Sequence, residues 1–182
     1  MRVQVDNFVV FAAADFDYRE LALNWVAHVR ARGHANALLL AMDSELVAEL
    51  SRRGIAHADN SANLAAWNAT CLQRHVQAVR TERHVAAAAL VTASYDVLLC
   101  DVTAVFTADP MPYLLDASRQ ADVLFQRDDW PADPHKVGLA VNSGFVYYRG
   151  SSSRAAEVAR LIGAAVERGL IEFYLRWNNI VD

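Results

Sequence analysis

The segment DVLLCDVTAVFTADP, residues 96–110, begins with a short apolar run that ends in a single carboxylate, Asp101. Such a run predicts a strand in the middle of a parallel sheet, and these sheets bind ligands beyond the carboxyl ends of their strands. A carboxylate there can bind a ribose hydroxyl or a hard cation such as magnesium or manganese. Thr103 stands where a second carboxylate would complete a metal-binding pair. Asp101 could equally be a turn or capping residue, and the residues alone leave both interpretations open.

Arg83 is the second residue whose position suggests chemistry. It lies in a predicted helix over residues 70–93 and falls on the same face as the apolar residues Leu72, Val76, Val79, Ala86 and Leu90. A buried guanidinium needs an anion, and either a diphosphate or Asp101 itself would serve. The alternative is a side chain whose stem is buried while its charged end reaches solvent.

The elements that must position these residues alternate between strands and helices. We predict strands over residues 7–14, 37–43, 55–58, 96–100, 121–125 and 143–149, and helices over residues 18–32, 44–53, 70–93 and within 151–169. Gly33 and Gly54 are expected to end the first two helices. Asp17 and Glu20 have capping-box spacing before the first helix, and Ser44 can cap the second. This order predicts an α/β fold with a largely parallel sheet.

Composition and charge disfavour several classes of protein. A chain of 182 residues suits one α/β domain, and a net charge of -4 with scattered Lys and Arg disfavours a nucleic-acid partner. No apolar run approaches the roughly 20 residues that span a bilayer, and the first residues lack the apolar core of a signal peptide. We therefore expect a cytoplasmic protein. The hydrophobic share of 54% also suggests a homo-oligomer in which another subunit covers part of the surface.

Four segments follow one another along the chain: LALNWVAHVRARGHANALLLAMD, YDVLLCDVTAVFTADPMPYL, ADVLFQRDDW and NSGFVYYRG. Together they resemble the nucleotide-diphospho-sugar transferase family, glycosyltransferases of the GT-A fold in which a strand ends in Asp-x-Asp. The resemblance covers nearly the whole chain. It implies a Rossmann-like three-layer fold, with a mostly parallel mixed sheet flanked by helices.

The same resemblance implies roles for Asp101 and Thr103. Asp101 matches the first Asp of the family motif, which meets the nucleotide ribose and the shell of the metal, so it is a candidate for metal binding and catalysis. Thr103 falls on the last Asp, the usual direct metal ligand. Because a threonine hydroxyl is neutral, we expect Thr103 to contact substrate only weakly and a manganese or magnesium ion to be held poorly.

Other positions of the family's donor site carry over in the same way. Arg83 matches the basic residue on the helix before the Asp-x-Asp strand. Asn142, Ser143 and Gly144 match the Asn-Thr/Ser-Gly-Phe segment that lines the donor sugar, where Gly144 would allow close approach of the backbone. The alternative for Asn142 is a turn at the start of a strand.

Three further candidates come from loops. Asp128 and Asp129 match the acidic end of the strand that the family runs towards the sugar, and they could orient sugar hydroxyls or an acceptor, with Asp129 as a catalytic candidate. Taken without the resemblance, QRDDWPADP is a solvated loop. Ala13 begins the first loop, residues 13–17, where a GT-A fold receives the base and ribose.

The family continues past the Trp of its last helix to an Asp-Gln element and further sugar contacts, whereas this sequence ends at RWNNIVD. We therefore predict a single glycosyltransferase-like domain over residues 1–182 without that segment. Either the chain was cut or the protein has lost its catalytic end.

The leading hypothesis for function is a glycosyltransferase that binds a nucleotide-diphosphate sugar, in a uridine form, and transfers the sugar to an unknown acceptor. The alternative is an inactive or weakly active relative that binds a nucleotide or a protein partner, which Thr103 and the short end favour. An unrelated flavodoxin-like or receiver-type module fits the strand and helix order alone. That module leaves NSGF and ADP unexplained.

Overall fold

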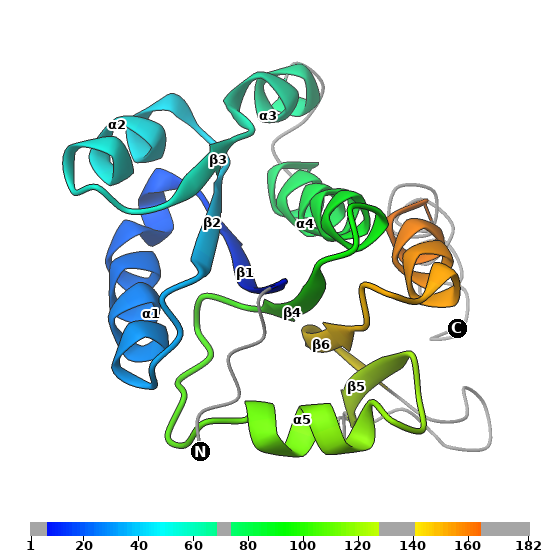
Figure 1. Ribbon diagram of the computed structural model, residues 1–182. Coiled ribbons are helices and arrows are strands. Elements are labelled where there is room, and N and C mark those ends of the chain that lie inside the picture. Colours follow the sequence, from blue (N-terminus) through cyan, green and yellow to red (C-terminus); the bar gives the residue numbers. More distant parts are fainter. Residues whose placement is uncertain (1–6, 69–73, 128–140, 165–182) are drawn as a thin grey trace, which may run out of the picture.

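The computed structural model describes residues 7–68, 74–127 and 141–164, and Figure 1 shows a central sheet with helices on both sides. The strands are β1 (Phe8–Ala14), β2 (Ala37–Ala41), β3 (His57–Asp59), β4 (Asp96–Cys100), β5 (Val123–Arg127) and β6 (Val141–Tyr148). The helices are a 3-10 turn η1 (Phe16–Tyr18), α1 (Arg19–Ala31), α2 (Ser44–Arg52), α3 (Ser61–Asn68), α4 (Arg74–Thr92) and α5 (Met111–Ala117). A further helix covers residues 153–164.

The six strands form one mixed sheet in the order β3-β2-β1-β4-β6-β5. Strands β1 to β4 run parallel, while β6 is antiparallel to both of its neighbours, β4 and β5. The predicted α/β fold with a mostly parallel mixed sheet is therefore confirmed. Because β6 is reversed, its first residues lie at the same edge of the sheet as the last residues of β4.

Side chains alternate between two apolar layers, as the pleat of a strand requires. Val10, Ala12 and Leu98 face α1, α2 and α5, whereas Phe11, Leu99 and Val146 face α4 and the helix over residues 153–164. In Figure 1 these two helices lie side by side on one face of the sheet, opposite α1. Both faces are covered, which explains why the β4 sequence is apolar at every position after Asp96.

Several helix ends differ from the predictions. Asp43, not Ser44, caps α2, since its Oδ1 accepts a hydrogen bond of 2.8 Å from the Leu46 backbone N–H. At α1 no side chain caps the first turn, and the predicted capping box is wrong. Asp15 instead caps the preceding 3-10 turn. The prediction that Gly33 and Gly54 end α1 and α2 is confirmed, because the two glycines adopt left-handed φ values of 94° and 64°.

Two short helices were not predicted. Residues around Asn60 were expected to form a polar link, but α3 begins at Ser61, whose N–H donates to Asp59 Oδ1 at 2.9 Å. Asp109 plays a similar part before α5, because its Oδ1 accepts from the Met111 N–H at 3.0 Å. Both helices have seven or eight residues, so neither contains enough turns to show a clear apolar period.

The buried face of α4 is rotated from the predicted one. Its most deeply buried side chains are Ala78, Thr81, His84, Ala87 and Val91, while the predicted Val79, Ala86 and Leu90 are only half-buried. The helix packs on the sheet and also against the helix over residues 153–164, whose Gly163 lies beside Val85. Because α4 is covered on two adjacent faces, a single apolar stripe in its sequence does not identify all of its buried residues. None of the helices in the described part of the chain is long and apolar enough to cross a membrane.

Candidate functional site

The pairing of β4 with β6 places two predicted site residues, Asp101 and Gly144, on the same face of the sheet, where β4 ends and β6 begins. Leu99 pairs with Val146, and both point into the layer beneath α4. Asp101 follows Leu99 by two residues and Gly144 precedes Val146 by two, so the pleat directs them to the same side. The Asp101 N–H donates to the Gly144 carbonyl at 2.8 Å, which extends the pairing one step beyond the strand.

Arg83 reaches this edge from α4. Its Nη1 forms an ion pair with Asp101 Oδ1, and its Nη2 donates to the carbonyl and the Oγ of Ser143 at 3.3 and 3.2 Å. The Arg83 side chain is only 10% exposed, whereas that of Asp101 is 44% exposed. The structure therefore agrees with the interpretation in which Arg83 is buried and Asp101 serves as its anion. The exposed part of the carboxylate remains open to solvent.

Gly144 makes this arrangement fit. A Cβ at Gly144 would lie 2.7 Å from Asp101 Cγ and still closer to Asp101 Oδ2. The small residue was expected to let the backbone approach a donor sugar, but the Asp101 carboxylate occupies the space beside it. Asn142 Oδ1 accepts a hydrogen bond of 2.7 Å from the Gly144 N–H. Asn142 is the second residue of β6 and pairs with Gln126, so it does not form the turn proposed as its alternative role.

Three titratable groups near the Arg83–Asp101 pair, His84, Tyr148 and Cys100, are neutral at pH 7. Burial, with a smaller contribution from the Arg83 charge, lowers the pKa of His84 to about 3. Burial also raises the pKa of Tyr148 well above its ordinary range, against the opposing effect of Arg83. The Cys100 thiol has a raised pKa, first from burial and then from the negative charge of Asp101. A thiol held protonated in this way is a packing residue and not a nucleophile.

The remaining predicted residues are more dispersed. Thr103 is exposed in the turn that the Ala104 N–H closes onto the Asp101 carbonyl at 2.9 Å. Ala13 does not begin a loop, because β1 continues to Ala14 and the Ala13 side chain packs in the layer beneath α4. Asp128 and Asp129 lie outside the described residues, and their roles stay predictions.

Sequence analysis missed two polar groups at the same sheet edge. Asp43 follows β2, and its Oδ2 accepts a hydrogen bond of 2.7 Å from the Phe16 N–H, which ties the turn after β1 to the end of β2. Asn60 follows β3 and donates to Glu82 Oε2 at 3.0 Å, next to Arg83 on α4. A systematic search for polar residues directly after each strand would have found both.

A solved structure shares this architecture. The chain matches a crystal structure of the galactosyltransferase LgtC in complex with donor and acceptor sugar analogues, with a TM-score of 0.58 and 17% sequence identity. The match covers 90% of this chain and 70% of that one. The order of strands and the helices on both faces are thus those of a GT-A fold.

A family model identifies the class of protein more directly. The model for nucleotide-diphospho-sugar transferases matches residues 32–160, and the chain belongs to this family. Two curated relatives from Arabidopsis thaliana are Arabinosyltransferase XEG113, 24% identical over 160 residues, and Beta-arabinofuranosyltransferase RAY1, 26% identical over 172 residues. These matches cover 81% and 90% of this chain but only 24% and 31% of the relatives.

Among the residues that the structure describes, the donor atoms around Asp101 do not fit the divalent cation that the family often uses. One oxygen of Asp101 is paired with Arg83, and Thr103, which the resemblance places on the next motif position, is neutral. Within residues 7–68, 74–127 and 141–164, no group of three or more His, Cys, Asp or Glu side chains could hold a metal ion. Hard cations are bound through several oxygens, among which carboxylates contribute most of the charge. The described residues supply one carboxylate that already has a counter-ion.

Proposed function

We propose that this protein binds a nucleotide-diphosphate sugar, in a uridine form, at the edge of the sheet formed by β4 and β6, and transfers the sugar to an acceptor. The observation that carries the proposal is Arg83, a buried cation fixed at the ligand-binding edge of a family member. A guanidinium is a planar donor that matches two phosphate oxygens at once. Its contacts with Ser143 are 3.2 Å or longer, so phosphate oxygens can replace them with shorter ones.

The geometry suggests how each group would act. Cleavage of the bond between the sugar's anomeric carbon and the diphosphate leaves negative charge on the departing phosphate, which the Arg83 guanidinium would stabilise. The exposed part of Asp101 can accept a hydrogen bond from a ribose hydroxyl. The acceptor oxygen forms the new bond to the sugar and gives up its proton to the departing phosphate oxygen or to solvent water. Positioning this oxygen against the anomeric carbon would supply much of the rate. Asp128 and Asp129 stay the predicted contacts for the sugar or acceptor.

Arabinose is the first sugar to test. Both relatives from Arabidopsis thaliana are named as arabinosyltransferases, and their matches cover most of this chain. The galactosyltransferase structure is 17% identical and supports the fold alone. We therefore propose uridine diphosphate arabinose as the donor, with a pentose in preference to a hexose.

A panel of sugar nucleotides tests this proposal. Hydrolysis or transfer is measured with uridine diphosphate carrying arabinose, xylose, galactose or glucose, alongside guanosine diphosphate mannose as a control for the base. We expect release of uridine diphosphate to be fastest from the arabinose donor. Faster release from a hexose donor would contradict the choice of sugar, and no binding of any nucleoside diphosphate would contradict the whole proposal.

A nucleotide-binding relative without transferase activity is the second candidate. The observation in its favour is the exposed, neutral Thr103 where the family carries a carboxylate. This candidate predicts that uridine diphosphate raises the melting temperature while no donor in the panel is consumed. The two measurements together distinguish it from an active enzyme.

A further inference from the structure

We propose that Arg83 is the resident positive charge of this site and that nucleoside diphosphates bind here without a divalent cation. The inference rests on the proposed function and specifies how its diphosphate is held. In the usual arrangement a metal ion lies between acidic side chains and the diphosphate. Here the cation is part of the chain, and it reaches the same sheet edge from α4.

The first argument is the charge at the site. Asp101 carries a single negative charge, and its Oδ1 already faces the Arg83 guanidinium. Thr103 adds none. A divalent cation bound to the other oxygen of Asp101 would be repelled by the guanidinium a few ångströms away, because like charges at short range destabilise each other. A diphosphate that approached the guanidinium itself would instead be attracted to it.

The second argument is that Arg83 is ordered before any ligand arrives. Its side chain is 10% exposed and has three contacts in the structure, one with Asp101 and two with Ser143. A long cationic side chain ordinarily loses conformational freedom when it binds a phosphate, and here that loss has already occurred on folding. The guanidinium also remains charged at every physiological pH.

The third argument is the fit of Asp101 against Gly144. A side chain at Gly144 would collide with the Asp101 carboxylate, so only glycine lets Asp101 lie where it holds Arg83. Asp101 is then a positioning residue that directs the guanidinium. Ser143, the second partner of Arg83, lies one residue before Gly144 in β6. The two Nη atoms of Arg83 are therefore held by residues on either side of the same glycine contact.

Binding of uridine diphosphate to the unaltered protein, measured by calorimetry with EDTA and then with manganese or magnesium, tests the inference directly. We expect the dissociation constants to agree within about threefold, since the described residues offer the metal no second carboxylate beside Asp101. Binding only in the presence of a metal would overturn this inference and leave the proposed function standing. Absence of binding under every condition would overturn both.

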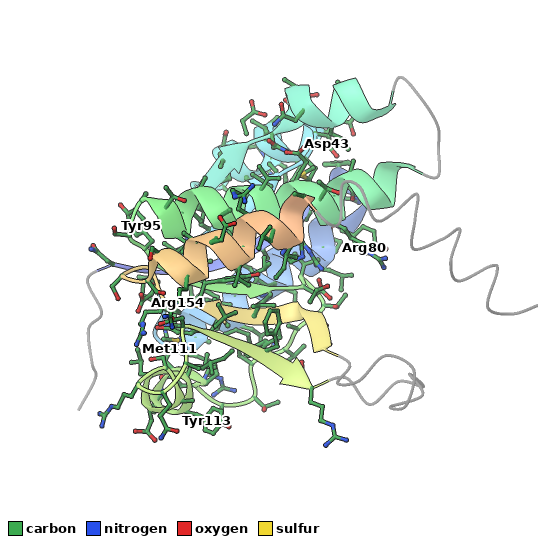
Figure 2. The ribbon with its side chains drawn as sticks, turned by 90° about the vertical axis from the view of Figure 1, so that its right-hand side faces the viewer. Asp43, Arg80, Tyr95, Met111, Tyr113 and Arg154 are labelled. Atoms are coloured by element: carbon green, nitrogen blue, oxygen red, sulfur yellow. The ribbon has the colours of Figure 1, made fainter. Side chains whose placement is uncertain are left out.

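Substitutions then assign the charge to Arg83. In EDTA, Arg83→Gln should weaken uridine diphosphate binding by about tenfold or more, because a charge-assisted bidentate contact is lost. The affinity of Arg83→Lys should lie between those of the unaltered protein and of Arg83→Gln, since lysine keeps the charge but lacks the planar guanidinium. Arg154→Gln is the control, an exposed arginine in the helix over residues 153–164, which Figure 2 labels on the opposite side of the view from Arg80. Unchanged affinity in Arg83→Gln, with circular dichroism showing a folded protein, would refute the assignment.

Discussion

The two ends of β4 carry the same pair of residue types and use them differently. At its start, Asp96 accepts hydrogen bonds of 2.7 Å from the Tyr147 hydroxyl and from the Gly150 N–H. Just beyond its end, Asp101 pairs with Arg83 and lies against Gly144. In both places an aspartate at one end of β4 or just beyond it meets a glycine that lies in β6 or shortly after it.

The surroundings of each glycine distinguish the start of β4 from the end that carries the candidate site. A Cβ at Gly150 would lie 2.6 Å from the Ser94 carbonyl carbon and closer still to the backbone of Tyr95. At Gly144 the nearest atoms belong to the end of the Asp101 side chain, which can rotate away. The first end is closed by backbone that has no room to move. The second keeps an exposed, movable carboxylate, as a ligand site requires.

The largest expected effect is the loss of stability in Gly150→Ala. The added methyl group meets fixed backbone, and we expect the free energy of unfolding in urea to fall by about 3 kcal/mol. Gly54→Ala is the matched control, because its Cβ would meet nothing within 4 Å and only the left-handed φ of 64° opposes it. The control should lose about 1 kcal/mol. Equal losses in the two variants would show that the collision at Gly150 is unimportant.

The pH dependence of stability tests the end of β4 that carries the candidate site, where His84 lies next to Arg83. Burial and the Arg83 charge lower the pKa of His84 from 6.5 to about 3. Below its ordinary pKa the unfolded chain takes up a proton that the folded chain excludes, so stability falls as the pH falls from about 6.5 towards 3. Between pH 7 and pH 5 the expected loss is about 2 kcal/mol.

Urea unfolding of His84→Leu over the same pH range isolates this contribution. The variant should lose less stability than the unaltered protein between pH 7 and pH 5, because it has no imidazole to protonate. Parallel curves for the two proteins would mean that His84 is not held neutral in the folded state.

Gly144→Ala should separate stability from binding. The methyl group displaces a side chain and not backbone, so the free energy of unfolding should fall by about 1 kcal/mol, at the low end for overpacking. Uridine diphosphate affinity should fall by about tenfold, since the displaced Asp101 no longer directs Arg83. Calorimetry and urea unfolding of one preparation measure both. A stability loss as large as that of Gly150→Ala would remove the distinction between the two ends.

The smallest change is expected for Thr103→Asp without metal. Thr103 is exposed, and a carboxylate there should alter the free energy of unfolding by no more than about 0.5 kcal/mol. If Thr103 and Asp101 face one site, manganese should now strengthen uridine diphosphate binding relative to EDTA. Thr107→Asp is a control at another exposed position of the same loop, where no gain is expected. An equal gain in both variants would point to nonspecific attraction of the cation.

Much of the fold could be predicted because the signals are local. The apolar run of β4, the left-handed residues Gly33 and Gly54, and the alternation of strands with helices each reflect the surroundings of a few neighbouring residues. The errors have two causes. Tertiary contacts cover α4 on two faces and override its apolar pattern. The helices α3 and α5 are too short to show an apolar period.

The candidate site shows the same division between what local sequence signals determine and what tertiary contacts determine. By itself the sequence determined that Asp101 follows an apolar strand, that Arg83 lies on a helix, and that the neutral Thr103 stands two residues after Asp101. Only the tertiary structure decided that Arg83 pairs with Asp101 and Ser143 and that the carboxylate occupies the space beside Gly144. These contacts join residues 18 and 60 positions apart. They depend on the register of β4 against β6 and on where α4 crosses the sheet, and no local pattern of residues encodes either.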